Sequence, residues 1–141
     1  MIILDTNVLS EALRPRPEPS VISWLGGHAR ASLFVTAITE AEILAGIAIL
    51  EPGRRQLELQ AAVGAMFAAD FAGRILPFDS DGASAFAEIA TDRRRAGRPI
   101  SQFDAQIAAI ARSRGASVAT RNTKDFEGCG IGLIDPWATA R

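Results

Sequence analysis

The sequence predicts an α/β protein in which a parallel sheet is covered by helices on both faces. Short, almost wholly apolar runs alternate along the chain with longer segments of helical character, as expected when each crossover between parallel strands is a helix. The apolar runs lack the polar–apolar alternation of a strand with one face in water, which indicates burial on both faces. The chain shows no internal repeat and no long linker, so we expect residues 1–141 to form one domain.

The first half of the chain supplies two expected strands and three expected helices. Residues 1–4 are a short apolar run and form the first strand. Residues 6–13 form a helix that ends before a cluster of three prolines, and residues 20–27 form a second helix closed by two glycines. The β-rich run at residues 32–38 is the second strand, and the helix over residues 39–50 ends at a Pro-Gly pair.

The second half of the chain continues the same alternation. Residues 54–73 are rich in helix formers and end in glycine, and the apolar run at residues 74–78 forms the third strand. Helices are expected over residues 81–96 and 101–115, and a glycine closes the second of them. The last two strands are short apolar runs at residues 116–120 and 131–135.

Composition excludes several classes of protein. The formal net charge of −1 gives no overall positive field, so binding to nucleic acid requires a local basic patch or a bound metal. A single cysteine cannot form an internal disulfide. No apolar run approaches the roughly 20 residues needed to span a bilayer, and the start lacks the features of a signal peptide. We therefore expect a cytoplasmic protein without a membrane segment.

Four acidic residues fall at or near strand ends and helix starts, at Asp5, Glu42, Asp104 and Asp125. Each has an ordinary structural interpretation, either as a helix N-cap or as the acid of a capping pattern that begins with Ser or Thr. The acids at positions 79 and 81 precede the helix over residues 81–96, and we expect them to be structural.

Two of the four acids lie on helical faces that appear apolar in the sequence. Glu42 shares a face with positions 45, 46 and 49, and Asp104 shares one with positions 107, 108 and 111. A partly buried carboxylate needs a partner. The carboxyl ends of parallel strands lie along one edge of the sheet, so the four acids should gather there and repel one another. A bound divalent cation commonly offsets such repulsion between carboxylates.

The residue types favour a hard cation bound by oxygen atoms, Mg²⁺ or Mn²⁺. Zinc is disfavoured because the only histidine, His28, and the only cysteine, Cys129, are far apart in the sequence. No pairing of a nucleophile with a histidine base is visible, so covalent catalysis of that kind has little support.

Four segments stand out along the chain, namely ILDTNVLSE, TAITEAEILAGI, SQFDAQIAAIARSRGASVATRNTKDF and GLIDPW. In this order and spacing they resemble a PIN-domain protein of the VapC/FitB type, the ribonuclease toxins of bacterial toxin–antitoxin pairs. The resemblance extends over essentially the whole chain.

This resemblance implies a three-layer α/β/α sandwich around a short parallel sheet, with a Mg²⁺- or Mn²⁺-dependent nuclease centre. The catalytic and metal-binding positions that it implies are Asp5, Glu42, Asp104 and Asp125. The polar positions that it implies along the same site are Thr6, Asn7, Thr120 and Asn122. It also implies an RNA substrate, a cognate antitoxin protein and a homodimer.

The basic residues divide into one substrate candidate and one solvated group. Arg121 lies between two of the polar site positions and is the better candidate for a contact with RNA. Solvated cations that complement the dipole of their helix are expected in the basic run Arg93, Arg94, Arg95 and Arg98. The apolar residues of the segment 54–73 suggest either a surface for a partner or ordinary core packing.

We therefore expect an endoribonuclease in which a carboxylate-bound metal activates a water molecule for attack on an RNA phosphodiester. Other classes of protein fit the sequence less well. A phosphatase of the haloacid-dehalogenase type would need a second Asp where this chain has Asn7. A non-catalytic binding module with the same fold stays open.

Overall fold

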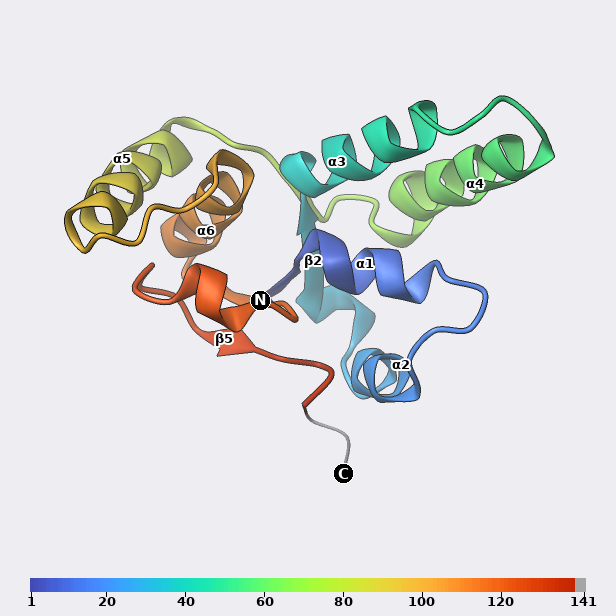
Figure 1. Cartoon of the computed structure of the whole chain (residues 1–141). Coiled ribbons are helices and arrows are strands. Elements are labelled where there is room, and N and C mark those ends of the chain that lie inside the picture. Colours follow the sequence, from blue (N-terminus) through green and yellow to red (C-terminus); the bar gives the residue numbers. More distant parts are fainter. Residues whose placement is uncertain (139–141) are drawn as a thin grey trace.

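A five-stranded parallel sheet with the strand order β3-β2-β1-β4-β5 lies at the centre of the computed structural model, which describes residues 1–138 (Figure 1). The strands are β1 (Ile2–Leu4), β2 (Leu33–Thr36), β3 (Ile75–Leu76), β4 (Ser117–Ala119) and β5 (Leu133–Ile134). All four neighbouring pairs are parallel. The five strands fall within the five predicted apolar runs, and the predicted α/β class is confirmed.

Helices cover both faces of the sheet and complete the predicted three-layer sandwich (Figure 1). The α-helices of the described residues are α1 (Thr6–Ala12), α2 (Pro19–Gly26), α3 (Ala37–Ala48), α4 (Arg54–Ala65), α5 (Ser80–Arg95) and α6 (Gln102–Arg114). Three shorter turns are the 3₁₀-helices η1 (Arg30–Ser32) and η3 (Thr123–Phe126) and the π-helical segment η2 (Met66–Asp70). Within residues 1–138, none of the helices has the length and apolar character needed to cross a bilayer.

Alternation along the strands divides the core into two layers. Ile3 and Val118 are fully buried against α5 and α6, whereas their neighbours Leu4 and Ala119 are buried against the layer that α1 to α4 supply. Because both faces of each strand meet helices, both must be apolar. This explains why the strands read as unbroken apolar runs in the sequence.

The chain reverses its direction across the sheet beside β1. From β1 it proceeds outward through β2 and β3, and it then returns to place β4 on the other side of β1. The register pairs Leu4 with Ala119, so the residues that follow these two strands leave the sheet side by side. Such a switch point opens a crevice at the carboxyl ends of the strands, where ligands bind in open α/β sheets.

One predicted helix start was wrong. The sequence placed the beginning of the helix after β2 at Thr39, within a Thr-x-x-Glu capping pattern. The structure begins α3 at Ala37, and the cap is Thr36, whose hydroxyl accepts a hydrogen bond from the Thr39 amide at 3.1 Å. Thr39 is fully buried inside the helix. The strand runs directly into the helix without a loop, and this displaces the cap by one turn.

The predicted single helix over residues 54–73 is also divided. It ends as a regular α-helix at Ala65 and continues through the wider turn η2, in which the Phe71 amide donates to the Met66 carbonyl at 3.0 Å. Val63, Phe67 and Phe71 are buried in the core along this segment. Core packing therefore accounts for much of the apolar character of this segment.

Two glycine substitutions should change stability in opposite directions. Gly115 ends α6 with a φ of +66°, so Gly115→Ala should destabilise the protein by about 1 kcal/mol through backbone strain. Gly64 lies exposed within α4, and nothing stands within 4 Å of an added Cβ. Gly64→Ala should stabilise the protein by about 0.5–1 kcal/mol.

Urea unfolding of both variants beside the unsubstituted protein measures the two changes. Each variant serves as the other's control, because both add the same methyl group where no neighbour lies within 4 Å. A stabilising Gly115→Ala would contradict the left-handed helix end.

Candidate active site

Polar side chains gather where β1, β2 and β4 end. A cavity of about 490 Å³ opens there, between α1, α3, α6 and the segment after β4. The predicted site residues that line it are Asp5, Thr6, Asn7, Glu42, Asp104, Arg121 and Asn122. The topology therefore brings together residues that are more than 100 positions apart in the chain.

Asp5 is the most buried carboxylate of the cavity, with 5% of its surface exposed. Its Oδ1 accepts a hydrogen bond from the Thr6 amide at 2.8 Å, which caps α1, and its Oδ2 accepts one from the Thr120 hydroxyl at 2.8 Å. Burial raises the pKa of Asp5 to about 6 despite these two hydrogen bonds, and the charges of Asp104 and Glu42 raise it further. The predicted N-cap role of Asp5 is thus confirmed, and its second carboxylate oxygen is bound by Thr120.

Thr120 links the ends of β1 and β4. Besides donating to Asp5, its hydroxyl accepts hydrogen bonds from the Asn7 side-chain amide at 3.3 Å and from the Asn122 backbone amide at 3.1 Å. The Asn7 Oδ1 accepts in turn from the Arg121 backbone amide at 3.3 Å. Thr120 is fully buried and does not line the cavity. Thr120 therefore orients Asp5, and its predicted role in substrate binding stays a prediction.

Glu42 reaches the cavity from α3 and is half-buried. Its Oε1 accepts a hydrogen bond from the Thr6 hydroxyl at 2.8 Å, and the Thr6 and Thr39 hydroxyl oxygens lie 3.0 Å apart. This chain of hydroxyls orients the carboxylate across the gap between α1 and α3. Thr6, which was predicted to line the site, thus positions Glu42 directly.

The face of α3 that was predicted to turn Glu42 toward the core does not lie against the core. Ala45, Gly46 and Ile49 on that face are exposed, and Ile49 is 85% exposed. The buried face of α3 runs instead through Thr39, Ile43 and Ile47. Glu42 therefore lies at the boundary between the buried and exposed faces, which explains how it lines an open cavity.

Asp104 enters from the first turn of α6 and is half-buried. Its backbone amide donates to the Ser101 hydroxyl at 3.2 Å, which confirms the predicted Ser-x-x-Asp cap. Burial raises the pKa of Asp104, and the charge of Asp125 raises it further. The stripe below it was predicted correctly, because Ile107, Ala108 and Ala111 are all fully buried.

Asp125 lies beside the cavity and does not line it. It is exposed on η3, and together with Asp104 it lines a smaller adjoining cavity of about 180 Å³. Asp104 therefore belongs to both cavities and stands between Asp125 and the other two acids.

The cavity has a basic and aromatic side that sequence reasoning largely missed. The Arg121 guanidinium lies 5.1 Å above the ring of Trp137, and both residues line the cavity. Arg14 also lines it, in an ion pair of 3.1 Å with the buried Glu11. A hydrogen bond from the Glu18 amide lowers the pKa of Glu11, and Arg14 lowers it further. The only sequence signal for Trp137 was its place in the GLIDPW segment.

The basic run at the end of α5 was predicted to be solvated, and this is only partly correct. Arg94, Arg95 and Arg98 are exposed, as expected. Arg93 is buried, with 7% of its surface exposed. The helical period turns this one arginine of the run toward the core.

The acids present an oxygen-only donor set that suits a hard divalent cation. The buried Asp5 is destabilised as an anion by its surroundings and by two neighbouring acids, and a cation would relieve this repulsion. Among residues 1–138, no three acidic, histidine or cysteine side chains come close enough to enclose a metal ion by themselves. A metal here would need water or substrate oxygens to complete its coordination, as Mg²⁺ usually does.

Comparison with known proteins identifies the family of the chain. The PIN domain family matches residues 2–128 of the chain. The chain is 42% identical over 137 residues to plasmid stability protein StbB of Pseudomonas syringae pv. tomato, with 97% of this chain and 99% of that protein covered. It is 37% identical over 140 residues to VapC ribonuclease Y4jK of Sinorhizobium fredii, with 99% of this chain and 100% of that protein covered.

A third relative is toxin FitB of Neisseria gonorrhoeae, 39% identical over 137 residues, with 97% of this chain and 99% of that protein covered. The crystal structure of FitAcB from the same bacterium superimposes with a TM-score of 0.92 at 39% identity and covers 97% of this chain and 99% of that one. The likeness of the fold thus extends over nearly the full length of both chains.

Asp5→Asn should stabilise the metal-free protein at neutral pH, because it removes a buried charge and keeps the shape of the side chain. The folded-state pKa of Asp5, about 6, lies above the ordinary value of 3.8. Its contribution to stability is therefore full below pH 3.8 and is lost as the pH rises through about 6. The loss amounts to at most about 3 kcal/mol.

Urea unfolding in EDTA at pH 4 and at pH 8 measures this difference. The variant should be clearly more stable than the unsubstituted protein at pH 8 and should differ little at pH 4. Asp92→Asn makes the same chemical change at an exposed position of α5 and should have little effect at either pH. An Asp5→Asn variant no more stable than the unsubstituted protein at pH 8 would show that burial of this charge carries little cost.

Proposed function

This chain belongs to the PIN domain family, and from that premise we propose that it is a metal-dependent endoribonuclease that hydrolyses RNA phosphodiester bonds. The observation that carries the proposal is the convergence of Asp5, Glu42 and Asp104 on one cavity at the switch point of the sheet. A relative 37% identical over its whole length is a ribonuclease of the VapC type, which supports RNA as the substrate.

Asp5, Glu42, Asp104 and Asp125 are the acids to which we assign catalysis and metal binding. Metal dependence is general among PIN-domain ribonucleases, and we propose Mg²⁺ as the ion, with Mn²⁺ able to replace it. When bound, such a metal lowers the pKa of a coordinated water and offsets negative charge on the phosphate. Asp5 and Asp104 would hold the ion, because both line the cavity and burial raises the pKa of each.

The protein's own residues prepare this site in three ways. The Thr6 amide and the Thr120 hydroxyl fix both oxygens of Asp5, and the Thr6 hydroxyl fixes Glu42. Partial burial reduces competition from bulk water at the acids. Asp5 and Glu42 are thus already oriented by the protein before substrate binds, which reduces their reorganisation.

Substrate binding is assigned to the basic and amide side of the cavity. Arg121 supplies a cation for an RNA phosphate, and the ring of Trp137 holds its guanidinium in place. Asn7 and Asn122 line the same wall, and their amide groups can bond phosphate or sugar oxygens. This wall also explains how a chain with a net charge of −1 could bind a polyanion.

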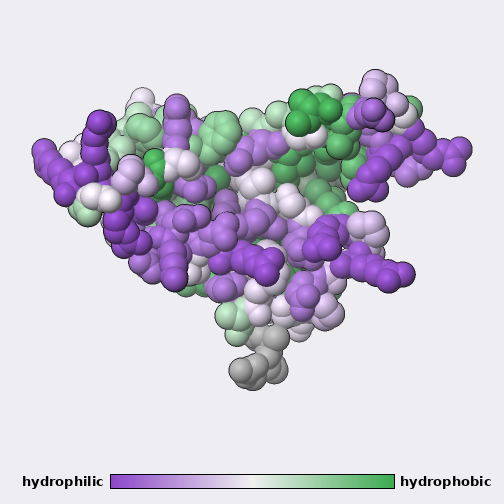
Figure 2. Space-filling view, viewed as in Figure 1, coloured by the Kyte–Doolittle hydropathy of each residue, from purple (hydrophilic) through white to green (hydrophobic). Residues whose placement is uncertain are grey.

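We also propose that the protein is the toxin of a toxin–antitoxin pair, acts in the cytoplasm as a single PIN domain over residues 1–141, and binds a cognate antitoxin and a second copy of itself. The relative FitB is a toxin, which supports this assignment. Apolar surface gathers over α3 and α4 in Figure 2, where Leu44, Ile49, Leu50 and Leu57 are exposed. Exposed apolar side chains in such number suit a protein partner.

Incubation of the purified protein with total cellular RNA should give cleavage in Mg²⁺ or Mn²⁺ and none in EDTA. Asp5→Asn and Asp104→Asn should each reduce the rate at least about 100-fold, because each removes a negative charge from the metal site with little change of shape. Asp92→Asn on the outer face of α5 is the matched control and should cleave normally.

Two outcomes would overturn the ribonuclease assignment. One is full activity of both Asp→Asn variants. The other is the absence of RNA cleavage by folded protein whose thermal midpoint rises with added metal, which would leave a binding role for the site.

Arg121→Gln should raise the KM for RNA about 10-fold and change kcat much less, because it removes a cation from the substrate wall and leaves the acids in place. Lys124→Gln removes an exposed charge from the same segment, where the residue does not line the cavity, and should change KM less. Steady-state cleavage of one RNA by the three proteins separates the two effects. A lower kcat at unchanged KM would place Arg121 at the reacting phosphate instead.

A further inference from the structure

Arg93 is a buried arginine that forms no salt bridge with any acid among the described residues. It lies on the last turn of α5. Its guanidinium donates only to uncharged groups. Nε bonds the Arg98 carbonyl at 2.7 Å, and Nη1 bonds the carbonyls of Asp125 at 2.8 Å and Glu127 at 2.9 Å. A weaker contact of 3.8 Å reaches the sulfur of the buried Cys129.

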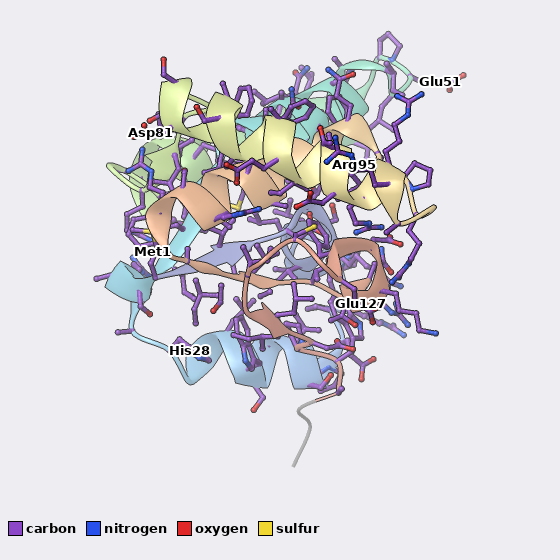
Figure 3. All side chains as sticks on the ribbon, turned by 90° about the vertical axis from the view of Figure 1, so that its left-hand side faces the viewer. Met1, His28, Glu51, Asp81, Arg95 and Glu127 are labelled. Atoms are coloured by element: carbon purple, nitrogen blue, oxygen red, sulfur yellow. The ribbon has the colours of Figure 1, made fainter. Side chains whose placement is uncertain are left out.

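Burial of a cation is costly, so this arrangement calls for a reason beyond the solubility of a helix end. Arg94 and Arg95 are exposed on the same turn and complement the helix dipole at much lower cost. Figure 3 shows Arg95 on the outer surface of α5 and Glu127 on the segment below it. Arg93 bridges the same two parts of the chain from inside.

The three carbonyls belong to two segments, and each segment carries an acid of the site. The Arg98 carbonyl is in the loop that leads to Ser101, whose hydroxyl caps α6 beneath Asp104. The other two carbonyls belong to Asp125 itself and to the residue that follows η3. The planar guanidinium of Arg93 therefore fixes the loop before α6 and the η3 segment relative to each other. The ammonium group of a lysine would hold the two segments less well.

The charge of Arg93 acts in the same place. Arg93 lines the cavity of about 180 Å³ together with Asp104 and Asp125. It lowers the pKa of Asp104, in opposition to burial and to the charge of Asp125. An exposed ion pair of 3.1 Å between Arg98 and Glu127 spans the same two segments, but a surface pair contributes little. The buried guanidinium is therefore a stronger tie between them than this surface pair.

We propose that Arg93 is a positioning residue of the metal site, which fixes the segments that carry Asp104 and Asp125 relative to each other. This inference rests on the proposed function, because it assumes that these two acids bind the metal. Arg93 itself touches neither metal nor RNA. It acts through the backbone of η3 and of the loop before α6.

Metal-induced stabilisation tests the proposal without any need for turnover. The thermal unfolding midpoint is measured at increasing Mn²⁺, without RNA, for the unsubstituted protein, Arg93→Gln, Arg93→Lys and the control Arg94→Gln. Arg93→Gln should raise the half-saturating metal concentration about 10-fold or more, as expected when a residue that orients metal ligands is lost. Arg93→Lys keeps the charge without the planar fork and should give a smaller rise. Arg94→Gln should give none.

A double variant shows whether Arg93 acts through the acid that it supports. In the Asp125→Asn background, Arg93→Gln should raise the half-saturating concentration much less than it does alone, because one of its two targets is already lost. Equal effects in the two backgrounds would overturn an action through Asp125. Steady-state cleavage should show a lower kcat for Arg93→Gln at saturating RNA in limiting metal, with KM for RNA nearly unchanged.

The outcomes separate this inference from the proposed function. If Arg93→Gln lowers the midpoint in EDTA but keeps the half-saturating metal concentration of the unsubstituted protein, Arg93 only stabilises the fold and the inference is wrong. If Arg93→Gln does not fold, the Arg93→Lys variant is the test. A half-saturating metal concentration of Arg93→Lys within about twofold of that of the unsubstituted protein then overturns the proposal. An unsubstituted protein that neither gains stability from metal nor cleaves RNA would instead overturn the proposed function.

Discussion

The in-register parallel pairing of β1 with β4 is the constraint on which the rest of the site depends. The register sets Leu4 beside Ala119, and the Asp5 amide continues it with a hydrogen bond of 2.9 Å to the Ala119 carbonyl. Asp5 and Thr120 therefore leave the sheet side by side, and the threonine hydroxyl reaches the carboxylate. A shift of one residue would turn one of these side chains to the opposite face and remove the bond. Every other acid is positioned around this pair.

The site is held together by neutral donors, and this leaves its electrostatic repulsion intact. A backbone amide and threonine hydroxyls orient Asp5 and Glu42, while the arginines that line the cavity form none of these hydrogen bonds. No described lysine or arginine forms an ion pair with the central acids. Residues that were chosen for stability alone would not leave a buried carboxylate with a pKa of about 6. Proteins retain such strain where it serves a function, and here it favours capture of a cation.

Arginine performs three different tasks around this site. Arg14 is tied to Glu11 at the rim, Arg121 rests on Trp137 and faces the cavity, and Arg93 is buried behind the acids. The three lie on different elements, so no stretch of sequence concentrates their charge. A net charge of −1 therefore conceals a local concentration of charge, because both acids and arginines line this one cavity.

The sequence by itself determined the alternating strands and helices, the choice of candidate acids and the buried stripe below Asp104. These features depend on the local period of apolar residues and on short capping patterns, which are complete within one segment. Only the tertiary structure decided that Thr36 caps α3, that Glu42 lies at the edge of a buried face and that Arg93 is enclosed. Which face of a helix is buried depends on the neighbours that pack against it. Those neighbours come from distant parts of the chain, so the pattern of a single helix does not specify them.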